Sequence, residues 1–305
     1  MAWRVQEDCA FGSSVPAQVF QDSNTVVTVV GQQLKFSPCG ALGDPSVTKL
    51  MAAHTGHGIG VVATCAKTKQ FAYAERRLQP QICVCSYPDL QQLFSLDGAA
   101  EVELVALAFS RDGSRLISLS GAPDLRLSVW ELKSRQMLCQ EKVPAACSAA
   151  SFNPRSSSTL CVHAPSCLQL WTVKQSYQHF SLKAKEVQPV EEVGTGGLWG
   201  CHCWGVEDEL YAGTDTGAVI HSSLVHEPTL ALAAESAVSG LVAEASHLVI
   251  ACRDGSLTWC APRHSLGPAA RTKLLPPPSR CLPFARTGTP RRASRLCSSC
   301  ACPRP

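Results

Sequence analysis

Three short segments of this 305-residue sequence bring together residue types that can do chemistry. The first, Cys201-His202-Cys203, places three potential zinc ligands side by side. Protein zinc sites usually combine ligand groups with separated spacing, whereas successive residues of a β-strand point to opposite faces of the sheet. We therefore expect a strand with mixed burial at this position, and no metal site.

The second segment is a group of cysteines near the carboxyl end. Cys297 and Cys300 are spaced as C-x-x-C, with Cys281 upstream and Cys302 just beyond. A zinc finger would also need a histidine pair, and the nearest histidine, His264, lies too far back. A redox C-x-x-C needs a βαβ setting, which the sequence does not show. We interpret these cysteines as incidental members of a disordered tail.

The third segment, residues 54–60, has the sequence HTGHGIG and is rich enough in glycine to cradle a phosphate. It lacks the Lys-Ser/Thr ending of a P-loop and no helix pattern follows it, so a loop entering a strand is the better interpretation. No Gly-x-Ser-x-Gly is present, and no pair of carboxylates stands out from the aspartates of turns. The sequence thus predicts a protein that is not an enzyme, with no catalytic residue, no cofactor and no small-molecule substrate.

The elements that surround these segments are short strands. Hydrophobic residues make up 45% of the chain and charged residues 17%, a composition typical of a globular protein. Runs such as 26–30, 60–64 and 82–86 have strand length, are rich in β-branched or alternating apolar residues, and end at Gly, Pro, Asp or Asn. No convincing amphipathic helix is present. These features predict an all-β fold.

A repeat decides the architecture. Strand-like residues 105–110, a turn at 111–114 and two further strands are followed by the same pattern 43 residues after Phe109, at Phe152. Trp130 and Trp171 lie 41 residues apart. A period of about 40–45 residues with four short strands indicates a WD-repeat β-propeller, complete or incomplete. We count about five blades, some of them incomplete, and six at most.

Recurring residues can be assigned as structural blade markers. A tryptophan that ends the third strand packs between neighbouring blades, and an Asp-Gly pair supplies the positive φ of a tight hairpin. Weaker copies of the pattern follow near residues 215 and 254. The markers are Phe109, Asp112, Gly113, Trp130, Phe152, Trp171, Asp215, Gly217, Asp254, Gly255 and Trp259.

Charge divides the chain into unlike parts. Residues 262–305 contain nine Lys and Arg, no acid and nine prolines, so their net charge is +9 and that of residues 1–261 is −6. We predict a lead-in at 1–16, a propeller at 17–261 and a basic disordered tail at 262–305. The tail could attract an acidic surface, but with Phe284 as its single aromatic residue it predicts no specific nucleic-acid recognition.

The cellular compartment follows from what the sequence lacks. The first eight residues carry acids where a signal peptide needs a basic region, and no run of about 18 apolar residues follows. The 17 cysteines are an odd number, and most lie in apolar runs, where cysteine behaves as a small hydrophobic residue. We expect a cytosolic chain with reduced thiols and no contact with membranes.

Two segments carry a family resemblance. Residues 71–90, beginning Phe71-Ala72-Tyr73-Ala74, and residues 151–173, beginning Ser151-Phe152-Asn153-Pro154, resemble the amino-terminal propeller of the cilia- and flagella-associated protein 43 family. The resemblance covers roughly residues 15–260. It implies a scaffold of the ciliary or flagellar axoneme, within the cytoskeleton. The implied partners are an inner dynein arm, the doublet microtubule and a sister WD-repeat subunit of the tether, and the implied role is in flagellum assembly and motility.

The sequence also departs from the family, whose members continue into a second propeller and a coiled coil. Residues 262–305 match nothing in the family and read like an alternative carboxyl terminus. Two other kinds of function remain open. One is a general cytoplasmic WD-repeat adaptor, such as a substrate receptor of a ubiquitin ligase; the other is an enzyme or zinc-dependent nucleic-acid binder, which would have to use Cys201-His202-Cys203 or the tail cysteines. An unclosed propeller would expose strand edges, which predicts marginal solubility in isolation.

Overall fold

The computed structural model describes residues 19–20, 25–38, 47–188, 190, 197–206, 208–244 and 247–260. Strands and turns make up this part of the chain. Within the described residues, no helix is long and apolar enough to cross a membrane. The prediction of an all-β chain is confirmed.

The strands form six antiparallel sheets in chain order, which we call blades 1 to 6. Blade 1 comprises β1 (Val19–Phe20), β2 (Thr25–Val30), β3 (Gln33–Pro38) and β4 (Lys49–Ala52). Blade 2 comprises β5 (Ile59–Cys65), β6 (Gln70–Glu75), β7 (Ile82–Ser86) and β8 (Gln92–Leu96). Blade 3 comprises β9 (Leu104–Phe109), β10 (Arg115–Ser120), β11 (Arg126–Glu131) and β12 (Gln136–Lys142).

The second half of the chain repeats this plan. Blade 4 comprises β13 (Ala149–Asn153), β14 (Ser156–Ala164), β15 (Cys167–Ser176) and β16 (His179–Glu186). Blade 5 comprises β17 (Trp199–Trp204), β18 (Leu210–Thr214), β19 (Ala218–Ser222) and β20 (Thr229–Ala233). Blade 6 has three strands among the described residues: β21 (Val238–Ala243), β22 (Leu248–Cys252) and β23 (Leu257–Cys260).

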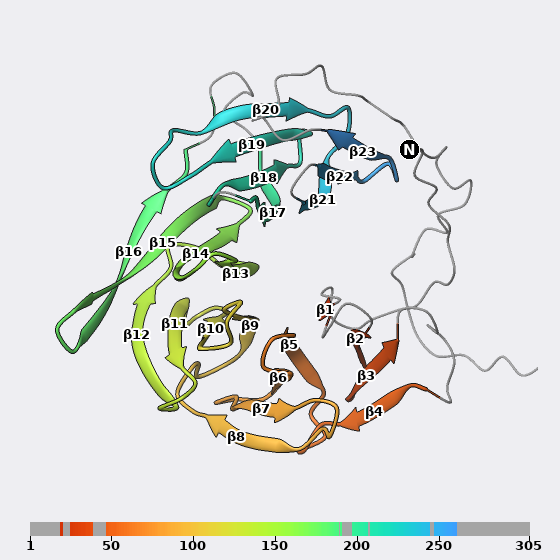
Figure 1. The fold of residues 1–305 in the computed structure, drawn as a ribbon, viewed down its shortest axis with the longest axis vertical. Coiled ribbons are helices and arrows are strands. Elements are labelled where there is room, and N and C mark those ends of the chain that lie inside the picture. Colours follow the sequence, from red (N-terminus) through yellow and green to blue (C-terminus); the bar gives the residue numbers. More distant parts are fainter. Residues whose placement is uncertain are drawn as a thin grey trace, which may run out of the picture.

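The blades are arranged around a central axis. Figure 1 shows the first strand of each blade nearest the centre and the fourth strand at the outside, with the chain passing from blade to blade around the ring. This arrangement is a β-propeller, as predicted. The described residues form six sheets, one more than the expected count of about five and equal to the expected maximum of six. The repeating tryptophan is replaced in two blades: Cys85 in blade 2 and His221 in blade 5 occupy its register position.

Burial explains why apolar residues in the strands follow one another in continuous runs and do not alternate with polar residues. A blade between two neighbours has both faces covered, so its middle strands are buried at successive positions, as in β6 and β10. The outer strands β8 and β12 keep exposed and half-buried residues instead. Continuous apolar runs are typical of strands buried on both faces.

Apolar clusters fill the junctions between consecutive blades. Five such clusters lie between blades 1 and 2, 2 and 3, 3 and 4, 4 and 5, and 5 and 6. The described residues contain no corresponding cluster that joins blade 6 to blade 1. Each junction is therefore a separate interface that holds one blade to the next, and the described ring has five of them.

The topology also fixes which turns lie together. Blades 1 to 5 each contain four antiparallel strands, an even number, so every blade starts at the same end of the ring. The turns between first and second strands and between third and fourth strands consequently share one end. The turns between second and third strands and the connections between blades share the opposite end. This division separates two surfaces of the propeller.

Candidate functional site: the polar junction of blades 4 and 5

The strand that carries Cys201-His202-Cys203 is β17, the innermost strand of blade 5. Cys201 and Cys203 pack against the apolar cluster shared with blade 6, whereas His202 contacts blade 4. The three side chains therefore alternate between two faces. Burial raises the pKa of Cys201 to about 11 and that of Cys203 to about 12, which keeps both as thiols. Among the described residues no three His, Cys, Asp or Glu gather as metal ligands would.

His202 belongs to a hydrogen-bonded polar junction between blades 4 and 5. Its Nδ1 lies 2.6 Å from Nδ1 of His163 on β14, and its Nε2 lies 2.7 Å from Oγ of Ser151 on β13. Trp204 Nε1 donates to the same Ser151 oxygen at 2.9 Å. The His163 and His202 rings meet edge to face, with centroids 4.8 Å apart. Four side chains from two blades thus form one polar chain.

The polar chain has one donor whose direction is fixed. An indole N–H can only donate, so Trp204 donates to Ser151, and the Ser151 hydroxyl can then donate to Nε2 of His202. In that arrangement His202 carries its proton on Nδ1 and donates it to Nδ1 of His163. In the other tautomer His202 Nε2 donates to Ser151, whose oxygen can accept twice, and His163 Nδ1 donates to His202 Nδ1. Both imidazoles are neutral in either arrangement, and every contact has one donor and one acceptor.

Protonation would break that pattern. Burial lowers the pKa of His163 to about 4, and burial together with the nearby His163 lowers the pKa of His202 to about 3. A charged imidazole carries a proton on both nitrogens, so the two facing Nδ1 atoms could no longer share one hydrogen bond if both rings were charged. Ser151 beside two histidines has the residue types of a hydrolase. Here its oxygen accepts from Trp204, and the chain of bonds joins two blades.

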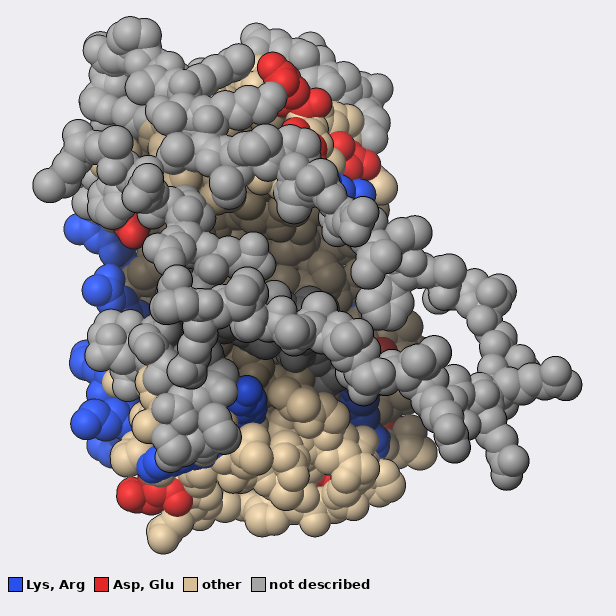
Figure 2. Space-filling view, turned by 90° about the vertical axis from the view of Figure 1, so that its right-hand side faces the viewer, with Lys and Arg blue, Asp and Glu red and all other residues tan. Residues whose placement is uncertain are grey.

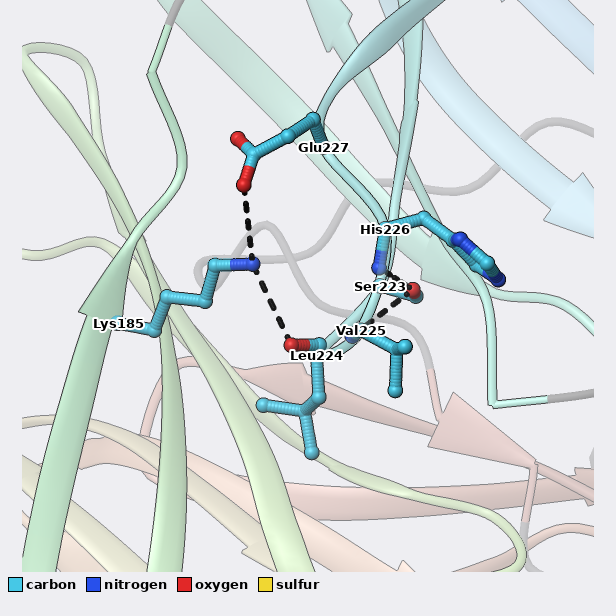
Figure 3. A network of polar contacts seen from close by, with 6 residues as sticks. All are labelled: Lys185, Ser223, Leu224, Val225, His226 and Glu227. Carbon is cyan, nitrogen blue, oxygen red and sulfur yellow. Dashed lines mark hydrogen bonds and ion pairs between the residues drawn. The ribbon is translucent and has the colours of Figure 1, made fainter.

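Further polar contacts strengthen the same junction. Asn153 Nδ2 donates to Asp208 Oδ1 at 2.8 Å, and Arg155 Nη1 donates to the Val206 carbonyl at 2.9 Å. At the outside of the ring, Lys185 Nζ donates to the Leu224 carbonyl at 3.3 Å and lies 4.0 Å from the Glu227 carboxylate (Figure 3). The Glu227 side chain is 87% exposed, so water screens this ion pair and it contributes little.

The loop at residues 54–60 is held by a carboxylate, not arranged around an empty site. Backbone N–H of Thr55 donates to Oε1 of Glu75 at 3.0 Å, and the Thr55 hydroxyl also donates to the Glu75 carboxylate. Glu75 is buried at the end of β6. The carboxylate therefore fixes the loop that connects blade 1 to blade 2, at a position where a phosphate would be repelled.

The turn markers lie where chains reverse. Asp112 and Gly113 lie between β9 and β10; the Asp112 carboxylate accepts from the Ser110 hydroxyl at 2.6 Å and from Ser114 N–H at 3.1 Å. Partial burial alone would raise the pKa of Asp112, but these hydrogen bonds hold it below its ordinary value. At Gly113, with φ +74°, a Cβ would lie 2.3 Å from Thr68 of blade 2.

The later markers occupy turns between second and third strands. Asp215 accepts from Leu198 N–H at 2.7 Å and Asp254 accepts from Ser256 N–H at 2.9 Å. Gly217 has φ +92°, and a Cβ there would lie 2.4 Å from the carbonyl oxygen of Ala234. Gly255 also has a positive φ, at +80°. Asp254 thus stabilises its own turn, whereas Asp215 holds the connection that precedes β17.

The aromatic markers differ in their surroundings. Trp130 on β11 lies in the junction of blades 2 and 3, and Phe152 and Trp171 lie in the junction of blades 3 and 4. Phe109, at the end of β9, packs half-buried against the Trp130 cluster. Trp259 on β23 has the equivalent register position in blade 6 and is half-buried. Trp130 Nε1 donates to Ser118 Oγ at 2.8 Å, whereas the buried Nε1 of Trp171 has no hydrogen-bond partner among the described residues.

A cleft of about 600 Å³ lies between blades 2 and 3 at the end opposite the Asp112 turn. Charged side chains of both signs line it, including Arg76, Arg77 and Glu103. Opposite charges on its walls favour neither an anion nor a cation. The tail cysteines 281, 297, 300 and 302, with the rest of the expected tail and the lead-in at 1–16, lie outside the described residues.

Sequence reasoning singled out Cys201-His202-Cys203 but missed the partners of His202. Hydrogen-bonded partners on different blades are 39 to 53 residues apart in the sequence. That separation is close to one blade repeat. A blade-by-blade alignment of polar residues in apolar runs could have placed them in adjoining strands.

Comparison with known proteins identifies relatives. The family model described as the CFAP43 N-terminal domain matches residues 43–258, more than half of the chain. Cilia- and flagella-associated protein 43 of Mus musculus is 29% identical over 188 residues, which cover 61% of this chain and 10% of that protein. Cilia- and flagella-associated protein 44 of the same species is 26% identical over 164 residues, covering 53% and 9%.

A more distant relative and a solved structure extend this picture. WD repeat-containing protein 90 of Homo sapiens is 28% identical over 116 residues, 38% of this chain and 7% of that protein. The crystal structure of the Cps50 (Swd1) β-propeller domain of Myceliophteria thermophila superposes with a TM-score of 0.57 at 14% identity, covering 70% of each chain. It supports the propeller fold. The chain spans about a tenth of the length of the curated relatives it matches.

Proposed function

The chain belongs to the CFAP43 N-terminal domain family, and we propose from this that it is a non-enzymatic docking scaffold of the ciliary or flagellar axoneme. The observation that carries the proposal is the family match over residues 43–258, which spans strands of all six blades. A propeller presents rigid turns and strand edges on which partner proteins can dock. The polar chain at Ser151 and His202 holds two blades together, which fits a structural role.

The finer proposal concerns partners and place. By resemblance to its family, the chain takes part in tethering an inner dynein arm to the doublet microtubule, together with a sister WD-repeat subunit. The similarity to cilia- and flagella-associated protein 44 supports a relationship to both subunits. Flagellum assembly and motility are the processes it would serve. Because the chain spans a tenth of those relatives, its incorporation needs a direct test.

The test is fractionation of the tagged full chain in multiciliated cells or spermatids, with detergent extraction. We expect the chain in the detergent-resistant axoneme, labelled together with axonemal neighbours in a proximity-labelling experiment. An unrelated tagged propeller expressed at the same level is the matched control and should be extracted. A fully soluble chain with ubiquitin-ligase subunits as its neighbours would contradict the proposal and favour the general-adaptor alternative.

A further inference from the structure

One end of the propeller carries an excess of positive charge. In blades 2 to 4 it contains the turns between first and second strands and between third and fourth strands. These turns and the strand residues beside them carry eight Lys and Arg and three Asp and Glu, a net charge of +5. The opposite end of the same blades carries five basic and seven acidic side chains. Charge is therefore divided between the two surfaces of the ring.

Seven of the basic side chains at this end are exposed. Arg155 is one of them and donates to the Val206 carbonyl; we call the other six the basic end. They come from four turns on three blades: Lys67, Lys69, Arg111, Lys133, Arg135 and Lys174. Figure 2 shows Lys and Arg side chains gathered along its left edge, the side that faces the viewer in Figure 1. The charges form a broad surface rather than a single pocket.

The charges of the basic end are not neutralised within the described part of the protein. None of its six side chains forms an ion pair there; the pairs present are Lys185 with Glu227 and His221 with Glu209. Two of the three carboxylates at this end are bound to their own turns: Asp112 by Ser110 and Ser114, and Glu131 by the Ser134 hydroxyl at 2.6 Å. The third, Asp89, lies in the turn between β7 and β8. The positive charges consequently remain available to a partner.

A projecting hairpin adjoins this surface. Strands β15 and β16 are ten and eight residues long, and their hairpin extends past the outer strand of blade 3 in Figure 1. Lys174 lies at the base of its turn, and Tyr177 in the turn is 95% exposed. Tyrosine is enriched in protein–protein interfaces relative to the rest of the surface. The hairpin thus adds an aromatic contact beside the basic residues.

We propose that the basic end docks a carboxylate-rich polypeptide. Its charges come one or two per turn, with the turn carboxylates of Asp112 and Glu131 fixed between them. A continuous phosphate backbone would meet those negative charges, whereas the side chains of an acidic polypeptide can reach separate basic turns. This surface goes beyond the proposed place in the axoneme and would function wherever the chain is located.

The experiment compares two triple charge reversals in the full chain. The first, Lys67→Glu, Arg111→Glu and Lys133→Glu, removes basic charge from three separate turns of the basic end. The matched control, Lys142→Glu, Lys183→Glu and Arg253→Glu, makes the same change of charge at exposed positions elsewhere on the described surface. The basic tail is identical in both variants, so its contribution cancels. Circular dichroism and urea midpoints establish that both remain folded.

The probe is a fluorescent polyglutamate peptide, with binding followed by anisotropy at low and high salt. We expect the basic-end variant to bind about tenfold more weakly or worse at low salt, and the control to lose less than about threefold. High salt should remove most of the difference, because exposed charges are screened.

Two outcomes would overturn the proposal. Equal weakening in both variants would show that net charge alone attracts the peptide. Tighter binding of an oligonucleotide, or of vesicles containing an anionic lipid, with the same dependence on the basic end would assign the surface to a different class of partner. Loss of axonemal retention with intact peptide binding would affect the proposed function and leave this inference standing.

Discussion

Replacing Ser118 by alanine should destabilise the propeller by about 1–3 kcal/mol, because it leaves a buried indole N–H without an acceptor. In the folded chain Trp130 Nε1 donates to Ser118 Oγ at 2.8 Å, and the two side chains are 3% and 1% exposed. Water cannot replace the lost acceptor without entering the junction of blades 2 and 3. The alanine side chain itself fits the space without strain.

Blade 4 supplies a natural control. Trp130 pairs with Leu116 in register and Ser118 follows two residues later, whereas Trp171 pairs with Leu160 and the equivalent position is Val162. Trp171 therefore already has the defect that Ser118→Ala would introduce, because its buried Nε1 lacks a partner within the described part of the chain. Val162→Thr keeps the side-chain shape and offers a hydroxyl. We expect it to be neutral or to stabilise by up to about 1 kcal/mol.

The assay is urea denaturation of the full chain followed by far-ultraviolet circular dichroism, which does not depend on the tryptophans that are changed. Trp130→Phe and Trp171→Phe complete the comparison, since both remove an indole but only the first removes a hydrogen bond. Trp130→Phe should cost about 1 kcal/mol more than Trp171→Phe, and the excess should vanish when Ser118 is alanine. Equal costs for the two tryptophans, with a neutral Ser118→Ala, would refute the reasoning.

Three further predictions concern other parts of the structure. The pKa values of His163 and His202 lie below the ordinary value near 6.5, so between that pH and about 4 the unfolded chain binds more protons than the folded chain. The free energy of unfolding should therefore fall by about 1–2 kcal/mol between about pH 6.5 and 5.5, as measured by urea titration at each pH. The fall should be smaller in the double variant His163→Gln/His202→Gln. Gly217→Ala should lower the melting temperature more than Gly31→Ala does, with a loss of stability of about 2 kcal/mol or more against about 1 kcal/mol. The reason is that a Cβ at Gly217 would lie 2.4 Å from the Ala234 oxygen, whereas a Cβ at Gly31 would have none of the described atoms within 4 Å. Equal shifts in melting temperature would show that the contact with Ala234 relaxes. Burial raises the pKa of Cys85 to about 12 and also raises the pKa of Cys83. Mass spectrometry should therefore find both thiols unmodified by iodoacetamide in the folded chain at about pH 8, and alkylated after unfolding in urea. Rapid modification of the folded chain would contradict their burial.

The fold could be predicted where the blades keep their turn chemistry and their aromatic residue. Blade 3 was evident because an Asp-Gly turn, regular strand lengths and Trp130 occur together, and Phe152 with Trp171 repeated the pattern in blade 4. These features are local, since they depend on residues within one hairpin or one strand pair.

The site could not be predicted for a reason of register. Whether His202 faces a metal, solvent or a second histidine depends on which face of β17 meets blade 4, and the sequence of one strand does not contain that information. The register shift between Trp199 and Cys201 makes a count from the blade start unreliable. The division of charge between the two ends of the propeller could not be predicted either, because it appears only when the turns of three blades are placed on one surface.

The contrast between Trp130 and Trp171 also indicates how the blades could lose their sequence similarity while keeping the fold. Each junction is a separate cluster shared by two blades, so a polar pair can be lost from one junction without changing the others. Blade 4 lacks the serine acceptor, yet its junction with blade 5 has the chain from Trp204 through Ser151 to the two histidines. Hydrogen bonds absent from one face of a blade are present on the other. A repeat search that scores each blade alone detects the lost serine–tryptophan pair but not the hydrogen bonds that replace it in the neighbouring junction. This accounts for the weakening of the repeat pattern beyond residue 200, although the strands continue to Cys260.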